Sequence, residues 1–165
     1  MPQFIDATGN LLDADVDALV NTMNTVGVMG KGIALEFKHA YPQNFRAYKR
    51  ACDAHQVKPG MMFVFDNCTG ETTERHWRNP SRIGDIVGGL EDLREWIERL
   101  RLRSLAMPPL GCGNGGLSWS DVRPLIEERL ATLGSDVNIH LFVPAERARL
   151  SETPMATTRA ATGDG

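Results

Sequence analysis

The sequence is poor in cysteine and has no long apolar run. Its three cysteines, Cys52, Cys68 and Cys112, are scattered and form no C-x-x-C pair. This pattern argues against a disulfide framework or a structural zinc site, and it suits a reducing compartment. No stretch approaches the roughly 18 apolar residues that cross a bilayer. The N-terminus also lacks the basic segment and apolar run of a secretory signal. We therefore expect a cytoplasmic protein that makes no membrane contact.

An excess of positive charge is also missing. The chain has 18 Lys and Arg against 21 Asp and Glu, for a formal net charge of −3. A protein that coats nucleic acid is usually strongly basic, so any nucleic-acid contact must be confined to a local patch. With 165 residues, 42% hydrophobic and 24% charged, the chain has the size and composition of one globular domain. Fibres, coiled coils and disordered chains are excluded.

Short strands alternate with helical segments along the chain. Strand-forming runs lie at residues 4–5, 18–20, 61–65, 104–107 and 139–143. Helical spacing occurs at residues 33–40, 44–52, 86–100 and 122–130, with Asn44 as the predicted N-cap of the second helix. This alternation predicts an α/β layer fold with a parallel or mixed sheet. We expect one domain over residues 1–145 and a flexible tail over residues 146–165.

Glycine is concentrated in two segments, each between a predicted strand and a predicted helix. We name residues 20–32 the first glycine loop and residues 108–117 the second glycine loop. Ligands of open α/β sheets bind at the carboxyl ends of strands, and glycine lets backbone N–H groups approach an anion closely. The helix after Gly32 adds free N–H groups. The two loops are expected to hold two phosphates or one diphosphate, and the alternative is that they only form tight turns.

Two common phosphate-binding motifs do not fit these loops. Lys31 is followed by Gly32 rather than by the hydroxyl residue of a Walker motif. The first strand is not followed by the G-x-G-x-x-G of dinucleotide-binding dehydrogenases. A Walker ATPase and an ordinary dehydrogenase are therefore disfavoured.

The two glycine loops, together with the turn at Gly9, Asn10 and Leu11, resemble those of a macrodomain. The likeness is to the macrodomain of DarG-type antitoxins, the partners of DarT toxins that ADP-ribosylate thymidine in DNA. It covers roughly residues 4–143 and implies a three-layer α/β/α macrodomain with a mixed central sheet. It also implies an ADP-ribose pocket that needs neither a metal nor a cofactor.

The resemblance assigns a place along the ligand to each segment of the pocket. The turn at Gly9, Asn10 and Leu11 would lie against the adenine. The start of the first glycine loop would lie near the distal ribose. The rest of that loop would flank the diphosphate, which the second glycine loop would wrap from the other side. The residues expected to contact ADP-ribose are Gly9, Asn10, Leu11, Asn21, Thr22, Asn24, Gly30, Lys31, Gly32, Ile33, Gly111, Cys112, Gly113, Asn114 and Gly115.

A basic and aromatic patch in the middle of the chain is the candidate nucleic-acid contact. An indole can stack on an unpaired base while arginines hold adjacent phosphates. The alternative is a surface loop whose tryptophan packs into the core. The patch consists of Arg75, His76, Trp77, Arg78 and Arg82.

The residue just before this patch departs from the family pattern. DarG-like relatives have a similar His-Trp-Arg run, preceded by a lysine that is regarded as catalytic. An ungapped match places Glu74 at that lysine, and several residues of the preceding strand are missing. A carboxylate cannot form an imine. Glu74 is therefore either a general base that activates water or a solvated surface residue.

Three other positions bear on the chemistry. Cys112 lies in the second glycine loop, where N–H groups would lower a thiol pKa, but the role that we expect for it is that of a small packing residue. A related human terminal ADP-ribose glycohydrolase uses an aspartate in this loop, at the position of Gly115. Lys31 lies beside the implied pocket and faces either phosphate or solvent.

Three functions remain open. The first is an ADP-ribosyl glycohydrolase that acts on modified nucleic acid, with thymidine-linked ADP-ribose on DNA as the expected substrate. The second is an ADP-ribose reader without hydrolytic activity, which the replacement by Glu74 favours. The third is an interaction module that has lost the pocket. The expected partners are ADP-ribose, ADP-ribosylated single-stranded DNA and a DarT-like toxin, and a monomer is expected.

Overall fold

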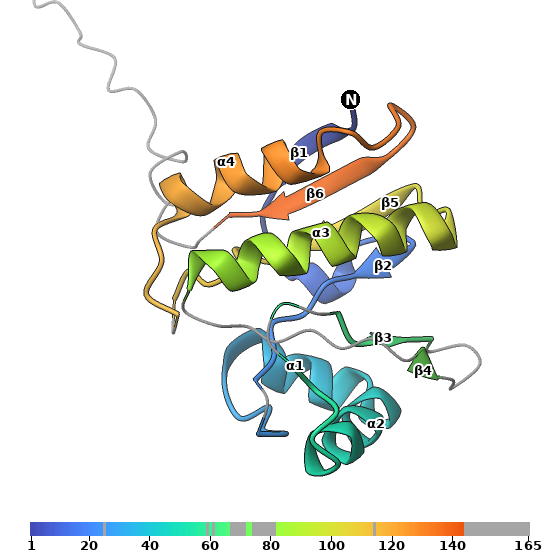
Figure 1. Cartoon of the computed structure of the whole chain (residues 1–165), viewed down its shortest axis with the longest axis vertical. Coiled ribbons are helices and arrows are strands. Elements are labelled where there is room, and N and C mark those ends of the chain that lie inside the picture. The colour runs from blue at the N-terminus through green and yellow to red at the C-terminus, as the bar shows by residue number, and fades with distance from the viewer. Residues whose placement is uncertain are drawn as a thin grey trace, which may run out of the picture.

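A computed structural model of the chain describes residues 1–24, 26–58, 60, 62–66, 72–73, 82–113 and 115–143, with backbone only at 72–73. The main sheet has the strand order β1–β6–β5–β2 (Figure 1). Its strands are β1 (Gln3–Ala7), β2 (Ala18–Leu19), β5 (Ser104–Met107) and β6 (Asn138–Phe142). Gln3 pairs with Asn138 at one end of the sheet, and Leu19 pairs with Ala106 on the far side.

The described strands of the main sheet are parallel throughout, so the mixed sheet expected from the sequence is corrected here. Each connection between these strands contains a helical segment that returns the chain to the starting edge, which gives parallel pairing. Antiparallel pairing occurs only between β3 (Val64–Phe65) and β4 (Thr72–Thr73), which form a separate two-stranded sheet in the part of the chain described.

Helices cover both faces of the main sheet. Helices α3 (Ile83–Leu100) and α4 (Trp119–Leu130) lie on one face. There they bury alternate strand residues such as Leu105 and Ile139 in a cluster that we name the sheet core. On the opposite face, Ala106 packs with Leu11 of the short helix η1 (Leu11–Asp13) and Phe37 of α1 (Gly32–Ala40). These contacts give the three-layer α/β/α arrangement expected from the sequence.

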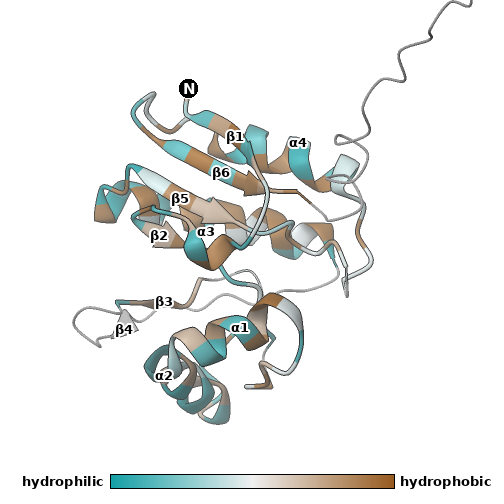
Figure 2. Ribbon diagram, turned by 180° about the vertical axis from the view of Figure 1, so that it is seen from behind, coloured by the Kyte–Doolittle hydropathy of each residue, from teal (hydrophilic) through white to brown (hydrophobic). Residues whose placement is uncertain are grey.

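Helix α2 (Pro42–Asp53) belongs to a second hydrophobic cluster, which we name the loop core. Its buried members are Met23, Met29, Ala47, Tyr48, Ala51, Cys52, Val57 and Phe63. The two methionines come from the first glycine loop, so α2 packs against that loop. Outside this buried face α2 is largely hydrophilic, whereas β5 is hydrophobic (Figure 2).

Several predicted boundaries differ from the structure by one to three residues. Helix α2 begins at Pro42 rather than after Asn44, because the fixed φ of proline suits the first helical turn and its missing N–H is not needed there. The strand predicted at residues 61–65 begins at Val64. The amphipathic stripe of α3 is confirmed from Ile86 to Ile97, while Leu100 is 46% exposed at the helix end.

Residues 144–165 lie outside the described part of the chain. The domain boundary at residue 145 and the tail beyond it therefore stay predictions. Within the described ranges, no helix combines the length and apolar character that a membrane crossing requires.

Candidate functional site

A cleft of about 920 Å³ opens where the parallel strands end. Thr8 follows β1, Thr22 follows β2, Pro108 follows β5 and Val143 follows β6, and all four line the cleft. Its volume lies in the range of small-molecule sites, and its place at the carboxyl ends of strands is that of ligand sites in open α/β sheets.

Most of the residues predicted to contact a ligand line this cleft. They come from the turn after β1, from the first glycine loop with the start of α1, and from the second glycine loop. These residues are Gly9, Asn10, Leu11, Thr22, Lys31, Gly32, Ile33, Gly111, Cys112, Gly113 and Gly115. Asn21, Asn24 and Gly30 are not among the lining residues. Asn114 lies outside the described residues.

Sequence reasoning missed six lining residues, namely Thr8, Glu36, Pro108, Pro109, Phe142 and Val143. Five of them lie at the carboxyl end of β1, β5 or β6 or within two residues after it. The cleft was expected at the strand ends, so these ends were themselves an available signal. Glu36 lies one turn after Gly32 on α1, and helical spacing would place both on one face.

The N-terminus of α1 supplies backbone donors to the cleft. Lys31 is the N-cap residue and makes no side-chain capping hydrogen bond, and Leu35 N–H is the first to bond back to its carbonyl. The N–H groups at the start of the helix are thus left for an anion. Gly32 lines the cleft with φ of +56°, a conformation that favours glycine.

The second glycine loop is closed by its own backbone. Leu117 N donates to Gly111 O at 3.0 Å, and Gly116 N donates to Gly113 O at 3.0 Å. A Cβ on Gly115 would lie 2.9 Å from the Gly111 Cα and would collide with its carbonyl oxygen. Because no side chain fits at position 115, this loop cannot hold the aspartate that the human glycohydrolase has there.

Cys112 is a half-buried thiol of the second glycine loop. Burial raises the pKa of Cys112, and the carboxylate of Asp121 raises it further. The sulfur lies 3.5 Å from the Leu110 carbonyl. Because burial disfavours the thiolate, this arrangement favours the packing role expected from the sequence.

Two charged side chains line the cleft within the described residues, Lys31 and Glu36. Both residues are exposed. Neither makes an ion pair or a side-chain hydrogen bond with another described residue. The amine of Lys31 therefore remains available to a negatively charged ligand.

Neither asparagine of the first glycine loop lines the cleft. Asn24 uses its amide group on the backbone of its own loop. The Oδ1 atom of Asn21 is buried and has no hydrogen-bond partner among the described residues.

The predicted nucleic-acid patch is described only at Arg82. Glu74, Arg75, His76, Trp77 and Arg78 lie outside the described residues. Arg82 is exposed and is the N-cap residue of α3. The next turn of α3 packs beside the second glycine loop, because Ile86 Cδ1 lies 3.0 Å from the position of a Cβ on Gly111. In the described ranges, no group of three or more His, Cys, Asp or Glu residues is placed to hold a metal.

The layered sheet and the cleft between two glycine loops define an α/β domain of the kind that binds nucleotides at its strand ends. The sequence model of the Macro domain matches residues 20–126. The chain belongs to the macrodomain family.

The relatives of this chain include two bacterial DNA ADP-ribosyl glycohydrolases. The Thermus aquaticus protein is 48% identical over 158 residues, which covers 90% of this chain and 44% of that protein. The Mycobacterium tuberculosis protein is 46% identical over 155 residues, which covers 88% of this chain and 43% of that protein. The chain thus spans less than half the length of these curated relatives.

Solved structures agree with this assignment. The macrodomain of Mycobacterium tuberculosis DarG superposes with a TM-score of 0.76 at 40% identity, over 88% of this chain and 100% of that one. The Thermosipho africanus DarTG structure, solved in complex with ADP-ribose, gives a TM-score of 0.67 at 31% identity, over 86% of this chain and 42% of that one.

Proposed function

We propose that this macrodomain binds ADP-ribose and removes it from modified DNA, with thymidine-linked ADP-ribose as the substrate. The observation that carries the proposal is the cleft, where two glycine loops and the uncapped start of α1 surround one space at the strand ends. The names of the relatives, which are DNA ADP-ribosyl glycohydrolases at 46–48% identity, support both the ligand and the reaction.

The diphosphate is the part of the ligand that the described residues fit best. The N–H groups that follow Lys31 lie on one side of the cleft, and the second glycine loop lies on the other. A helix N-terminus favours negative charge, and the Lys31 amine adds a positive charge beside it. The adenine then lies toward Gly9 and Leu11, as the resemblance implies.

The reaction breaks the bond between the ribose C1″ and the base nitrogen. The oxygen of water forms the new bond to C1″, and one water proton ends on the nucleobase nitrogen that leaves. The products are ADP-ribose and unmodified DNA. The closed second loop offers no carboxylate at Gly115. We therefore assign the general base to Glu74, the residue at the position of the family lysine.

The test uses a single-stranded oligonucleotide that carries one thymidine-linked ADP-ribose. Wild-type protein is expected to release ADP-ribose, which chromatography measures. If Glu74 is the base, Glu74→Gln lowers the rate about 10²- to 10⁴-fold and leaves ADP-ribose affinity unchanged. A gain of rate in Glu74→Lys would instead show that the lysine is the missing catalytic group.

The second candidate is an ADP-ribose reader, and the same residue favours it, because Glu74 replaces the lysine of the relatives. Calorimetry with ADP-ribose, together with the release assay on the oligonucleotide, separates the two functions. ADP-ribose binding without any release from the oligonucleotide supports the reader and contradicts the enzyme. Absence of ADP-ribose binding would contradict both and favour an interaction module.

A DarT-like toxin is the proposed biological counterpart, and the cytoplasm is the proposed site of action. One relative of this chain, from Thermosipho africanus, is a DNA ADP-ribosyl transferase-DNA ADP-ribosyl glycohydrolase fusion protein. Coexpression of this chain with a DarT toxin is expected to lower the ADP-ribose content of cellular DNA. Unchanged modification would contradict the antitoxin role.

A further inference from the structure

The first glycine loop carries cleft residues but lacks regular structure. Thr22 lies near its start and Lys31 near its end, and both line the cleft. Between them, residues 23–30 belong to no helix or strand where they are described. The shape of this segment therefore depends on side chains that hold its backbone.

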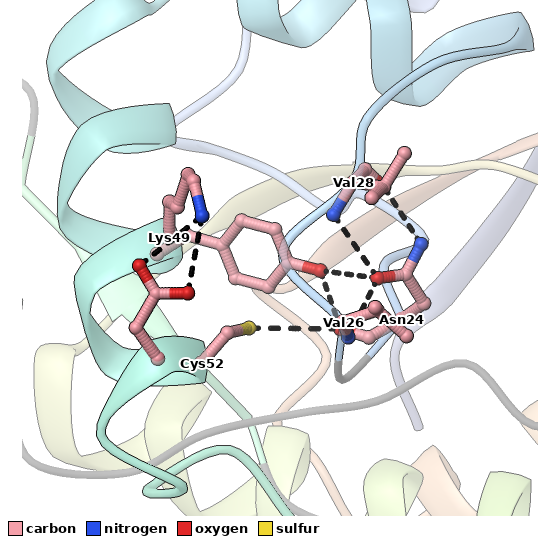
Figure 3. Close-up of polar contacts among 7 residues, drawn as sticks. Asn24, Val26, Val28, Lys49 and Cys52 are labelled. Carbon is pink, nitrogen blue, oxygen red and sulfur yellow. Dashed lines mark hydrogen bonds and ion pairs between the residues drawn. The ribbon is translucent and has the colours of Figure 1, made fainter.

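The side chain of Asn24 forms hydrogen bonds with the backbone of this segment (Figure 3). Its Oδ1 accepts from Val26 N at 2.9 Å and from Val28 N at 3.3 Å. Its Nδ2 donates to Val28 O at 2.7 Å. One amide group thus pairs with three backbone groups of the loop, and the two valines on either side of Gly27 are exposed.

Tyr48 of α2 is hydrogen-bonded to Asn24. Its hydroxyl donates to the Asn24 backbone carbonyl, and Asn24 Oδ1 lies 3.0 Å from the hydroxyl oxygen. The ring is fully buried in the loop core and meets the Phe63 ring edge-on at 6.0 Å between centroids. Burial raises the pKa of Tyr48, so the phenol keeps its proton and remains a donor at neutral pH.

The fit between α2 and the loop is close as well as polar. A Cβ on Gly27 would lie 3.4 Å from Cys52 Cβ and 3.5 Å from Lys49 Cγ, so the loop backbone rests directly on the helix. Gly27 has φ of +78°, which favours glycine. The contact at Gly27 and the Tyr48 hydrogen bond therefore both join the loop to α2.

We propose that Tyr48 is a positioning residue for the ligand. Through Asn24, Tyr48 holds the first glycine loop in the shape that presents Thr22 and Lys31 to the cleft. The proposal rests on the ADP-ribose binding proposed above. It gives Asn24 a structural role in place of the ribose contact expected from the resemblance. It also assigns a binding function to α2, a helix with no residue among those lining the cleft.

Tyr48→Phe tests the proposal because it keeps the buried ring and removes only the hydroxyl. We expect the Kd for ADP-ribose, measured by calorimetry well below the melting temperature, to rise about 5- to 10-fold, the effect of one hydrogen bond. In the ligand-free protein, the amide NMR signals of Val26 and Val28 are expected to shift.

Phe63→Leu is the matched control. It removes the ring that packs on Tyr48 in the same loop core but leaves the hydroxyl in place. This change is expected to lower the free energy of unfolding by about 1–2 kcal/mol and to leave the Kd for ADP-ribose within about twofold of wild type. A general loosening of the loop core, rather than loss of the hydroxyl, would instead raise the Kd in both variants.

A double-mutant cycle with Asn24→Ala completes the test. If Tyr48 acts through Asn24, the double variant loses less affinity than the sum of the two single losses, although Tyr48 still donates to the backbone carbonyl of residue 24 in Asn24→Ala. Unchanged affinity in Tyr48→Phe, or additive losses in the cycle, would overturn the proposal while the proposed function stands. Failure of the wild-type protein to bind ADP-ribose would contradict the proposed function and the positioning role together.

Discussion

At the residue scale, Gly115 is the position where the smallest change has the largest expected effect. A methyl group there would collide with the Gly111 carbonyl. Gly115→Ala must therefore open the second glycine loop, and we expect loss of measurable ADP-ribose binding with about 1–3 kcal/mol of destabilisation. Calorimetry and urea denaturation check both effects.

The control for this change is Gly84→Ala. Gly84 lies in the first turn of α3, and a Cβ there meets nothing within 4 Å. Alanine is expected to stabilise the helix by up to about 1 kcal/mol and to leave ADP-ribose affinity unchanged. Wild-type affinity in Gly115→Ala would show that the closed shape of the second loop is not needed for binding.

Lys31 carries a second prediction at this scale. Its exposed amine is the one positive charge among the described residues that line the cleft. Exposed charge pairs contribute little because solvent screens them, so Lys31→Ala is expected to weaken ADP-ribose binding only about 3- to 5-fold. Titrations at several salt concentrations should show a flatter dependence for the variant than for wild type.

Lys38→Ala is the matched control for the charge on α1. The Lys38 amine lies 4.5 Å from the centroid of the Phe45 ring and is not among the residues that line the cleft. Its removal should change ADP-ribose affinity by less than about twofold. An equal loss in both variants would mean that net charge, rather than the place of Lys31, attracts the ligand.

At the scale of the elements, Asp17 joins the start of β2 to the start of β5. Its Oδ2 accepts from Arg103 N at 2.8 Å and from Ser104 N at 3.0 Å. The hydrogen bond from the Arg103 backbone is the main cause that lowers the pKa of Asp17 below 3.8, against a smaller opposing effect of burial. A carboxylate with a lowered folded-state pKa stabilises the fold above its unfolded pKa and loses that effect as the pH falls through the folded pKa.

Asp17→Asn is therefore expected to destabilise the protein at pH 7 and not at strongly acidic pH. Because the carboxylate is mostly exposed, the loss at neutral pH should be only about 0.5–1 kcal/mol. Urea denaturation between pH 7 and pH 2 measures the difference from wild type. Asp15→Asn, which removes a carboxylate without a hydrogen-bond partner among the described residues, is the control. A difference that persists unchanged at low pH would contradict the role of the charge.

At the scale of the whole molecule, local patterns predicted the layers and the place of the cleft. The spacing of Ile86, Leu90 and Ile97 was enough for α3, and glycine after strand ends was enough for both loops. The structure adds what depends on residues far apart in the sequence. Tyr48 lies 24 residues from Asn24, and no local pattern connects a polar loop residue with a buried phenol. The exclusion of side chains at Gly115 likewise depends on how the loop folds back on itself.

The separation of the loop core from the sheet core leads to a prediction for the molecule as a whole. The buried residues of α2 all belong to the loop core, whereas those of α4 belong to the sheet core. The first glycine loop is packed with the loop core, and the second glycine loop follows β5 of the sheet core, so a ligand between the loops joins both parts. Bound ligand opposes only those openings that break its own contacts.

Saturating ADP-ribose is therefore expected to slow hydrogen exchange in α2 and in the first glycine loop more than in α4. Peptide-resolved exchange with mass spectrometry measures this difference. Gly115→Ala, which is expected not to bind, should show no change on addition of the ligand. Equal protection of α4 and α2 would mean that the two cores open as one unit, and α2 would then have no separate part in holding the ligand site.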